Sequence, residues 1–168
     1  VINLAAIVEK EAGRADERPR IAAVYLNRLK KRMRLEADPT VIYGASEGRG
    51  TLGRPILRSE LQDDDNPYNT YKNYGLPPTP IANPGRAAIE AVLKPAKSAD
   101  LFFVADGTGG HVFAETFAEH QRNVAKWRHI EKERESEQSW GATSAKNTPA
   151  AGDLQTVDIP LPQRNPRH

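Results

Sequence analysis

Residues 36–82 are dense in glycine, proline, asparagine and aspartate, as in "SEGRGTLGRP" and "DDDNPYNTYKNYGLPPTPIANPG". These residue types favour turns and interrupt helices and strands, and within the stretch only "TVIYG" has the pattern of a short strand. So long a segment without regular structure inside a domain is usually either functional or disordered. Its tyrosines argue against disorder. We therefore expect an ordered, loop-rich groove set between regular elements.

The sequence on both sides of this stretch predicts helices and one β-hairpin. Apolar residues repeat at helical spacing before it, and "LFFVADGTGGHVFAE" after it has the pattern of a strand, a glycine-rich turn and a second strand. Thr116 and Glu119 have the spacing of a capping box at the start of a last helix. The expected elements are a helix over 2–12 that ends at Gly13, a helix that begins with "DERP" at 16–19, a helix over 83–95, a hairpin over 101–115 and a helix from 117.

These elements predict the α+β class: an N-terminal helical hairpin, the loop-rich groove, a small antiparallel sheet with a β-hairpin and a C-terminal helix. After about residue 136 no period is sustained, and small, polar and proline residues dominate. We therefore expect one folded domain over 1–135 and an irregular Pro/Ser/Gln-rich tail over 136–168.

Charge and cysteine content exclude several classes of function. The 168 residues include 24 basic and 22 acidic ones, so the net charge of +2 does not demand nucleic acid. The absence of cysteine excludes disulfides, thiolate metal sites and cysteine nucleophiles. No apolar run approaches the roughly 18 residues of a membrane span, and no signal peptide is visible. The chain begins "VINLAAIV" without methionine, so we expect it to be part of a longer protein whose targeting signals lie upstream.

Two glutamates end the first predicted helix, in "AAIVEKEAG", and they lie on different faces of it. Each helical residue turns by about 100°, so with Leu4 at zero Ile7 lies near about 300° and Val8 near about 40°. On the same scale Glu11 lies near about 340°, between the two apolar residues, while Glu9 lies near about 140° on the solvent side. Glu11 therefore occupies the stripe that the helix must bury.

A carboxylate on a buried stripe loses hydration, which raises its pKa, and a raised pKa near neutrality is what a general acid requires. Glu11 also lies close to the end of the helix. From there its side chain can instead turn out to water or pair with an arginine such as Arg14, as acids in structural networks do. The spacing alone leaves both interpretations open.

Several long blocks of the sequence resemble the endolytic murein transglycosylase (YceG-like) family. They are "AAIVEKEAG", "IAAVYLNRLKKRMRLEADPTVIYG", "NPYNTYKNYGLPPTPIANPG" and "LFFVADGTGGHVF", and they occur in the family's order over roughly residues 1–130. The resemblance implies an enzyme without a cofactor that cuts the glycan strands of peptidoglycan internally. It also implies a single-pass anchor in the cell inner membrane, absent from this chain, with the catalytic domain on the periplasmic side.

The family's essential acid is the second glutamate of its E-K-E motif, which corresponds to Glu11 here, so the resemblance makes Glu9 dispensable for chemistry. It implies a non-hydrolytic cleavage between N-acetylmuramic acid and N-acetylglucosamine that leaves 1,6-anhydro ends. Glu11 would act first as acid and then as base. Ordinary glycosidases use two carboxylates, whereas here the substrate supplies its own nucleophile. The role implied for the cell is the termination of nascent glycan strands.

Further residues are candidates for substrate binding, each with a structural alternative. Asp38 can be a second carboxylate or cap the turn at Pro39. Thr40 can line a sugar cleft or belong to the short buried strand. Asn69 and Tyr71 offer an amide and an aromatic face of the kind that carbohydrates bind, yet Asn and Tyr also build packed turns.

His111 lies in the family's H-x-F position on the second hairpin strand, where it can orient Glu11 or a sugar hydroxyl, or be hydrogen-bonded beneath the hairpin. His120 also has a family counterpart, and its place on the last helix favours a structural role. Together with Glu115 and Glu119 these histidines lack the H-E-x-x-H spacing of a zinc site, so no metal is predicted.

Two other functions remain open. A non-catalytic module could grip peptidoglycan glycan strands through its tyrosine-containing loop, and a regulatory module could contact the peptidoglycan synthases, the penicillin-binding proteins. The charged segment "HIEKERESEQ" of the last helix could dock such a partner, although charged helix faces are usually only solvated.

Overall fold

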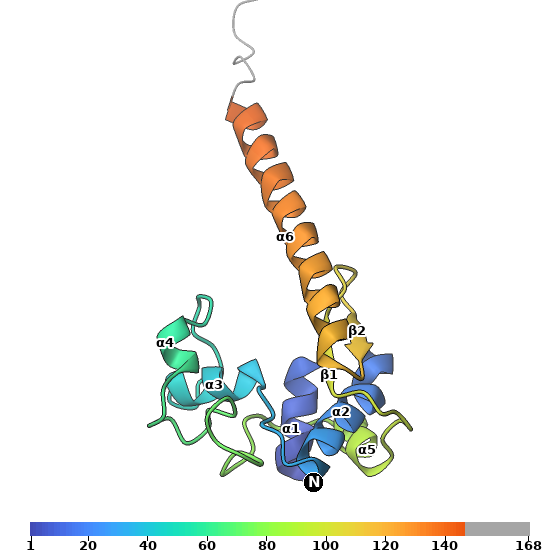
Figure 1. Ribbon diagram of the computed structural model, residues 1–168. Coiled ribbons are helices and arrows are strands. Elements are labelled where there is room, and N and C mark those ends of the chain that lie inside the picture. The colour runs from blue at the N-terminus through green and yellow to red at the C-terminus, as the bar shows by residue number, and fades with distance from the viewer. Residues whose placement is uncertain (147–168) are drawn as a thin grey trace, which may run out of the picture. The chain divides into compact units, whose positions relative to one another are not determined.

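The computed structural model describes the backbone of residues 1–146 and the side-chain environments of residues 1–136. Figure 1 shows the order of the elements. They are α1 (Ile2–Glu11), the 3-10 turn η1 (Ala15–Glu17), α2 (Arg18–Lys30), α3 (Asp38–Ala45), α4 (Arg58–Leu61), α5 (Arg86–Leu93), β1 (Phe102–Ala105), β2 (His111–Ala114) and α6 (Phe117–Lys146). This arrangement confirms the predicted α+β class.

Helices α1, α2 and α5 pack on one another and enclose the core (Figure 1). Each presents an apolar stripe at helical spacing, and removing those stripes from water is the main stabilising contribution to such a core. The buried apolar side chains that these three helices contribute to the core cluster are Leu4, Ala5, Ala6, Ile7, Val8, Ile21, Ala22, Tyr25, Ala88, Ala91 and Val92.

The prediction of a strand at "TVIYG" is wrong, because these residues form α3. Asp38 and Pro39 occupy its first turn. An acidic residue there interacts favourably with the helix dipole, and the backbone N–H that proline lacks would have no partner within the helix at this position. A short buried apolar run does not by its periodicity distinguish a strand from a helix. Thr40 and Val41 are fully buried, which explains their strand-like composition.

The loop-rich stretch after α3 is ordered by buried amides. Asn69 is fully buried and its side-chain nitrogen donates to the carbonyl oxygens of Asp63, Glu60 and Leu61, at 2.8, 3.2 and 3.3 Å. Its side-chain oxygen accepts the backbone N–H of Tyr71 at 3.0 Å. One side chain therefore ties α4 and the segment that follows it to the segment that carries Tyr71.

The hairpin pairs β1 with β2 in antiparallel register, with Ala105 opposite His111. Asp106 closes its turn, because one carboxylate oxygen accepts the backbone N–H groups of Thr108 and Gly110 at 2.7 and 3.2 Å. The turn lies against the end of α1: a Cβ at Gly13 would come within 2.6 Å of the carbonyl oxygen of Gly109, so a side chain there would force the two apart.

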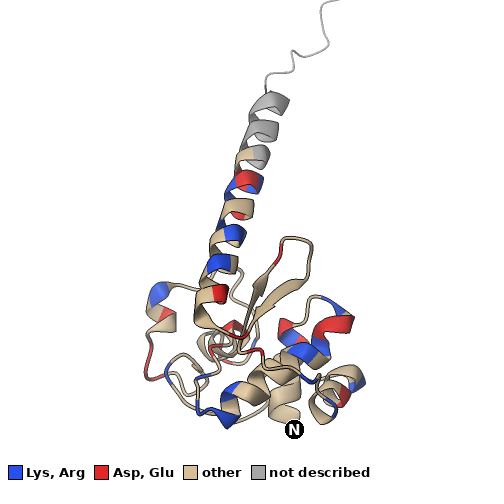
Figure 2. Ribbon diagram, turned by 45° about the vertical axis from the view of Figure 1, so that its right-hand side comes forward, with Lys and Arg blue, Asp and Glu red and all other residues tan. Residues whose placement is uncertain are grey.

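The capping box predicted at the start of α6 is confirmed. Thr116 Oγ1 accepts the backbone N–H of Glu119 at 3.3 Å, and Glu119 Oε2 accepts the backbone N–H of Thr116 at 3.3 Å. Figure 2 shows acidic and basic residues together on the part of α6 that the structure describes. The helix continues to Lys146, past residue 136 where the sequence predicted irregular chain.

The remainder of the predicted tail, 147–168, lies outside the described residues. The chain divides into two units, Val1–Lys132 and Glu133–His168, and the candidate site described below belongs to the first. Within the described residues, no helix combines the length and the apolar character needed to cross a membrane.

Candidate active site

Glu11 is the last residue of α1, one turn beyond the buried pair Ile7 and Val8. The helix that buries its apolar stripe against α2 and α5 therefore carries the Glu11 carboxyl group inward, as the angular position predicted. Figure 2 shows that the start of α1, beside the N-terminus, carries no charge. The side chain does not turn freely into solvent and is not paired with Arg14, which instead bonds Asp16 at 3.1 Å.

Glu11 lies on the wall of a cavity of about 400 Å³. Four parts of the chain that are distant in sequence meet there: α1, α2, the segment around α3 together with the loop after it, and the hairpin with the start of α6. The lining residues are Glu11, Tyr25, Arg28, Leu35, Glu36, Asp38, Tyr71, Phe103, Val104, His120 and Val124.

Burial raises the pKa of Glu11 from 4.5 to about 7. Loss of hydration is the largest cause, and it is opposed by a hydrogen bond from the Tyr25 hydroxyl to Oε1, 3.0 Å long, which lowers the pKa. The negative charge of Asp38 raises it further. At neutral pH Glu11 is therefore divided between its protonated and ionised forms, as a group that both gives and takes a proton requires.

Asp38 and Tyr71 form a hydrogen-bonded pair on the wall of the same cavity. The Tyr71 hydroxyl donates to Asp38 Oδ1 at 2.5 Å. Burial raises the pKa of Tyr71, and its bond to Asp38 raises it further, so Tyr71 stays a donor over the physiological range. Both predicted site residues thus lie with Glu11, and they hold each other in place.

Arg28 supplies positive charge to the cavity wall from α2. Its guanidinium is buried and donates to the backbone oxygens of Leu101 at 2.6 Å and Leu35 at 3.0 Å. It also pairs with the Glu36 carboxylate at 3.1 Å. Arg28 therefore joins α2 to the segments before α3 and before β1, which keeps these walls of the cavity together.

Thr40 and Asn69 do not lie on the cavity, although both were predicted to bind substrate. Both are fully buried. The Thr40 hydroxyl donates to the carbonyl oxygen of Ala37 at 2.6 Å and lies 2.9 Å from the Thr70 hydroxyl, while Asn69 holds the loop. Their hydrogen-bonding capacity is directed into the protein, so we assign them to the support of Asp38 and Tyr71 and leave them out of the substrate-binding set.

His111 contacts Glu17 rather than Glu11. Its Nδ1 lies 2.8 Å from Glu17 Oε2, and its backbone N–H donates to Glu17 Oε1 at 2.8 Å, so η1 holds the second strand of the hairpin at two points. This is the structural alternative that the sequence left open. A contact of His111 with substrate stays a prediction.

The sequence did not assign Tyr25, Arg28 or Phe103 to the site. Tyr25 is a buried residue of α2, and its hydroxyl is the signal that could have marked it, because a buried phenol needs a partner. His120, assigned a structural role, lies on the cavity wall and stacks on Phe102 with ring centroids 5.1 Å apart. Burial lowers the pKa of His120.

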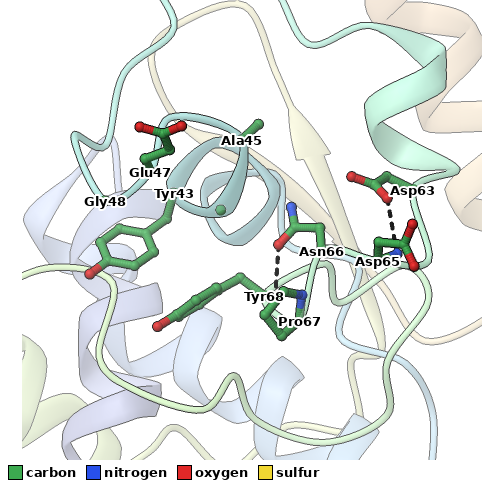
Figure 3. A pocket seen from close by; sticks show the side chains of 10 residues that line it. Tyr43, Ala45, Glu47, Gly48, Asp63, Asp65, Asn66, Pro67 and Tyr68 are labelled. Carbon is green, nitrogen blue, oxygen red and sulfur yellow. Dashed lines mark hydrogen bonds between the residues drawn. The ribbon is translucent and has the colours of Figure 1, made fainter.

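A second cavity, of about 440 Å³, lies beside the C-terminal end of α3 (Figure 3). The rings of Tyr43 and Tyr68, with centroids 4.8 Å apart, form one part of its wall. Its carboxylates, Glu47, Asp63 and Asp65, are exposed rather than buried. We therefore place the chemistry at the cavity of Glu11. In the part of the chain that the structure describes, no group of three or more His, Cys, Asp or Glu residues could hold a metal ion.

The raised pKa of Glu11 predicts a pH-dependent stability. Because the folded-state pKa is about 7 and the unfolded value 4.5, the stabilising contribution is fully present below pH 4.5 and is lost as pH rises through about 7. In Glu11→Gln this loss should be absent. The free energy of unfolding of the variant relative to wild type should therefore rise by up to about 3 kcal/mol from acidic to mildly alkaline pH. Urea unfolding of both proteins measures it, and parallel pH curves would contradict it.

Comparison with known proteins shows the family to which this chain is similar. The model of the YceG-like family matches residues 1–126. The "Endolytic murein transglycosylase" of Bacillus subtilis is 43% identical over 135 residues, which are 80% of this chain and 36% of that protein. The protein of the same name from Streptococcus pneumoniae serotype 2 is 40% identical over 131 residues, 75% of this chain and 23% of that protein.

A solved structure is also similar to this chain. The crystal structure of a YceG-like protein from Listeria monocytogenes superimposes with a TM-score of 0.63 at 43% identity, and the match covers 71% of this chain and 37% of that one. The chain thus spans between about a quarter and about a third of the length of these relatives.

Proposed function

Because the chain belongs to the YceG-like family, we propose that it is the catalytic part of an endolytic transglycosylase that cuts the glycan strands of peptidoglycan. The observation that carries the proposal is Glu11, an acid whose pKa is raised to about 7 on the wall of a cavity. The relatives named endolytic murein transglycosylases, 40 and 43% identical to this chain, support the choice of substrate.

In the proposed reaction Glu11 is the catalytic residue for both proton transfers. Its protonated form gives the proton to the glycosidic oxygen between N-acetylmuramic acid and N-acetylglucosamine, and the bond from that oxygen to C1 breaks. The resulting carboxylate takes the proton of the C6 hydroxyl group of the muramic acid, whose oxygen closes on C1. The product ends in a 1,6-anhydro ring, Glu11 is protonated again, and no water is consumed.

Asp38 has a supporting role in this scheme. Breaking a glycosidic bond builds positive charge on the sugar ring. The Asp38 carboxylate lies on the wall of the same cavity and its negative charge acts on Glu11, so it can stabilise that positive charge while it raises the pKa of Glu11. The Tyr71 hydroxyl holds the carboxylate by donating a hydrogen bond to its Oδ1.

Besides Glu36, which is paired with Arg28, the cavity holds the two carboxyl groups of Glu11 and Asp38. Hydrolysis is therefore the competing chemistry, since a hydrolase would use Asp38 to activate water or to attack the sugar. Mass spectrometry of purified murein digested by this protein in oxygen-18 water separates the two. We expect glycan ends whose mass is lower than that of reducing ends by one water molecule and that contain no oxygen-18. Labelled reducing ends as the main product would establish hydrolysis and overturn the proposed reaction.

We also propose that the protein terminates nascent strands at the cell inner membrane, next to the peptidoglycan synthases. The names of the relatives place their activity on murein, which supports a cell-wall location. A pulldown of the synthases with the charges of the segment 129–136 reversed tests the contact with a partner. Unchanged recovery of the synthases would remove this segment from the proposal.

A further inference from the structure

The two carboxylate oxygens of Glu11 have different surroundings. Oε1 accepts the hydrogen bond from the Tyr25 hydroxyl at 3.0 Å. Tyr25 is 2% exposed, so its hydroxyl meets Oε1 inside the protein, at the wall of the cavity that both residues line. Among the described residues the structure gives no hydrogen bond to Oε2, although Glu11 lines the cavity. Oε2 is therefore the oxygen left for a molecule that enters the cavity.

Tyr25 is held so that its hydroxyl keeps this position. Its ring packs edge-on against Phe103 of β1, with centroids 5.8 Å apart and an interplanar angle of 89°. Burial raises the pKa of Tyr25 well above 10, and the neighbouring charge of Glu11 raises it further. The hydroxyl therefore keeps its proton over the range in which Glu11 titrates, and it remains a donor to Oε1 whenever Glu11 is ionised.

We infer that Tyr25 is a positioning residue that occupies Oε1 of Glu11, so that a single oxygen, Oε2, carries the proton in both steps of the reaction. The occupation of Oε1 by Tyr25 rests on the geometry alone, and the proton transfer through Oε2 rests on the proposed function. A carboxyl group with two free oxygens could hold its proton on either one. With Oε1 occupied, the proton is on the oxygen that faces the substrate.

The proton balance of the two steps fits one oxygen. In the first step the Oε2–H bond breaks, its proton goes to the glycosidic oxygen, and the electron pair of the C1–O bond leaves with that oxygen. In the second step the oxygen on C6 forms a bond with C1, and its proton returns to Oε2. The negative charge that exists between the steps is stabilised at Oε1 by the hydrogen bond from Tyr25, because a bond to a charged acceptor is stronger than one to a neutral acceptor.

The test is Tyr25→Phe, which removes one oxygen and keeps the ring that packs on Phe103. Because the Tyr25 bond lowers the pKa of Glu11, its loss should raise that pKa above the wild-type value, measured by NMR titration of the labelled carboxyl carbon. Tyr68→Phe is the matched control. It loses a bond of similar length, 2.8 Å to the Thr79 hydroxyl, and that bond does not involve Glu11.

Kinetics on glycan strands give the second readout. We expect kcat to fall by about tenfold or more, because the ionised form of Glu11 loses a hydrogen bond to its charged oxygen, while KM changes little because the Tyr25 hydroxyl is already used by Glu11. The alkaline limb of the pH profile should move upward together with the pKa. Tyr68→Phe should change neither quantity.

The outcomes separate the two proposals. A pKa of Glu11 that is unchanged or lower in Tyr25→Phe, or a variant that no longer folds by circular dichroism, would overturn the positioning role and assign Tyr25 to the core alone. If wild type cuts no glycan strand while the pKa of Glu11 still rises in Tyr25→Phe, the proposed function fails and the occupation of Oε1 by Tyr25 stands. A lower kcat without a shift of the pH profile would overturn the one-oxygen mechanism.

Discussion

Glu11→Gln should lower the cleavage of isolated peptidoglycan by about a thousandfold or more, with binding of the glycan strands retained. The glutamine keeps the shape of the side chain and can still accept the Tyr25 hydrogen bond, yet it has no proton to give at any pH near neutrality. Proton transfer by a positioned side chain contributes about 10² to 10⁴ in rate, and here one side chain performs it twice. Release of anhydro ends from purified murein, followed by mass spectrometry, measures the loss.

Glu9→Gln is the control for this experiment. Glu9 lies two residues earlier on the same helix and has a different role, since its Oε2 accepts the backbone N–H of Gly85 at 3.1 Å and its Oε1 lies 3.7 Å from Arg18. It therefore secures the start of α5 rather than facing only solvent. This variant should keep its activity. Equal release of anhydro ends by wild type and Glu11→Gln would refute the catalytic role and favour the non-catalytic binding module.

Unfolding does not offer an alternative explanation for an inactive Glu11→Gln protein. The substitution removes a buried ionisable group whose charged form is costly, so near neutral pH it should stabilise the fold. A variant that is more stable, that binds glycan and that does not cut it would separate the chemistry from the folding.

Asn69→Ala should lower the free energy of unfolding by about 3 kcal/mol, the largest effect on stability that we expect from a single polar side chain in the loop-rich stretch. The change leaves the carbonyl oxygens of Glu60 and Leu61 and the backbone N–H of Tyr71, all in half-buried residues, without the partner that they have now. Each buried polar group left unsatisfied costs about 1 to 3 kcal/mol. Against a typical total of about 5 to 15 kcal/mol, this loss is large. Urea unfolding at constant pH measures it.

Asn73→Ala is the matched control. Asn73 donates to the carbonyl oxygens of Asn66 and Asn69 at 3.1 and 3.2 Å, but it is exposed, so water can replace the lost bonds. We expect a loss below about 1 kcal/mol. Equal destabilisation by the two substitutions would mean that burial of the Asn69 amide does not determine the order of the loop.

Asn69→Ala should also weaken catalysis at temperatures where the variant is still folded, because Tyr71 loses the hydrogen bond from its backbone N–H to Asn69.

The prediction of a strand over "TVIYG" was wrong for a physical reason. Five residues with three β-branched side chains are compatible with a buried strand and with a buried helix, and the choice depends on what surrounds them. The preceding Asp38 and Pro39 are residues that begin helices well, and they were interpreted as a turn. The error also affected Thr40, which as part of a strand could have lined a sugar cleft. On α3 it faces the Thr70 hydroxyl inside the protein.

Asn69 was predicted as a ligand for carbohydrate because an amide can both donate and accept. The same property allows it to satisfy backbone groups of a loop that has no regular hydrogen bonding, and this second use is the one the structure has. Residue type alone does not distinguish the two uses. Tyr71 and Asp38 were identified correctly as neighbours of Glu11, since all three line one cavity, while their contact with substrate stays a prediction.

The sequence by itself determined the helices of the core, the hairpin, the capping box of α6 and the placement of Glu11 on a buried stripe. These features depend on residues close together in the chain, whose spacing is visible in the printed sequence. The tertiary structure alone decided what that placement means. The pKa of Glu11 depends on burial, on the Tyr25 hydroxyl of α2 and on the charge of Asp38 at the start of α3, and only folding brings these groups to one carboxyl group.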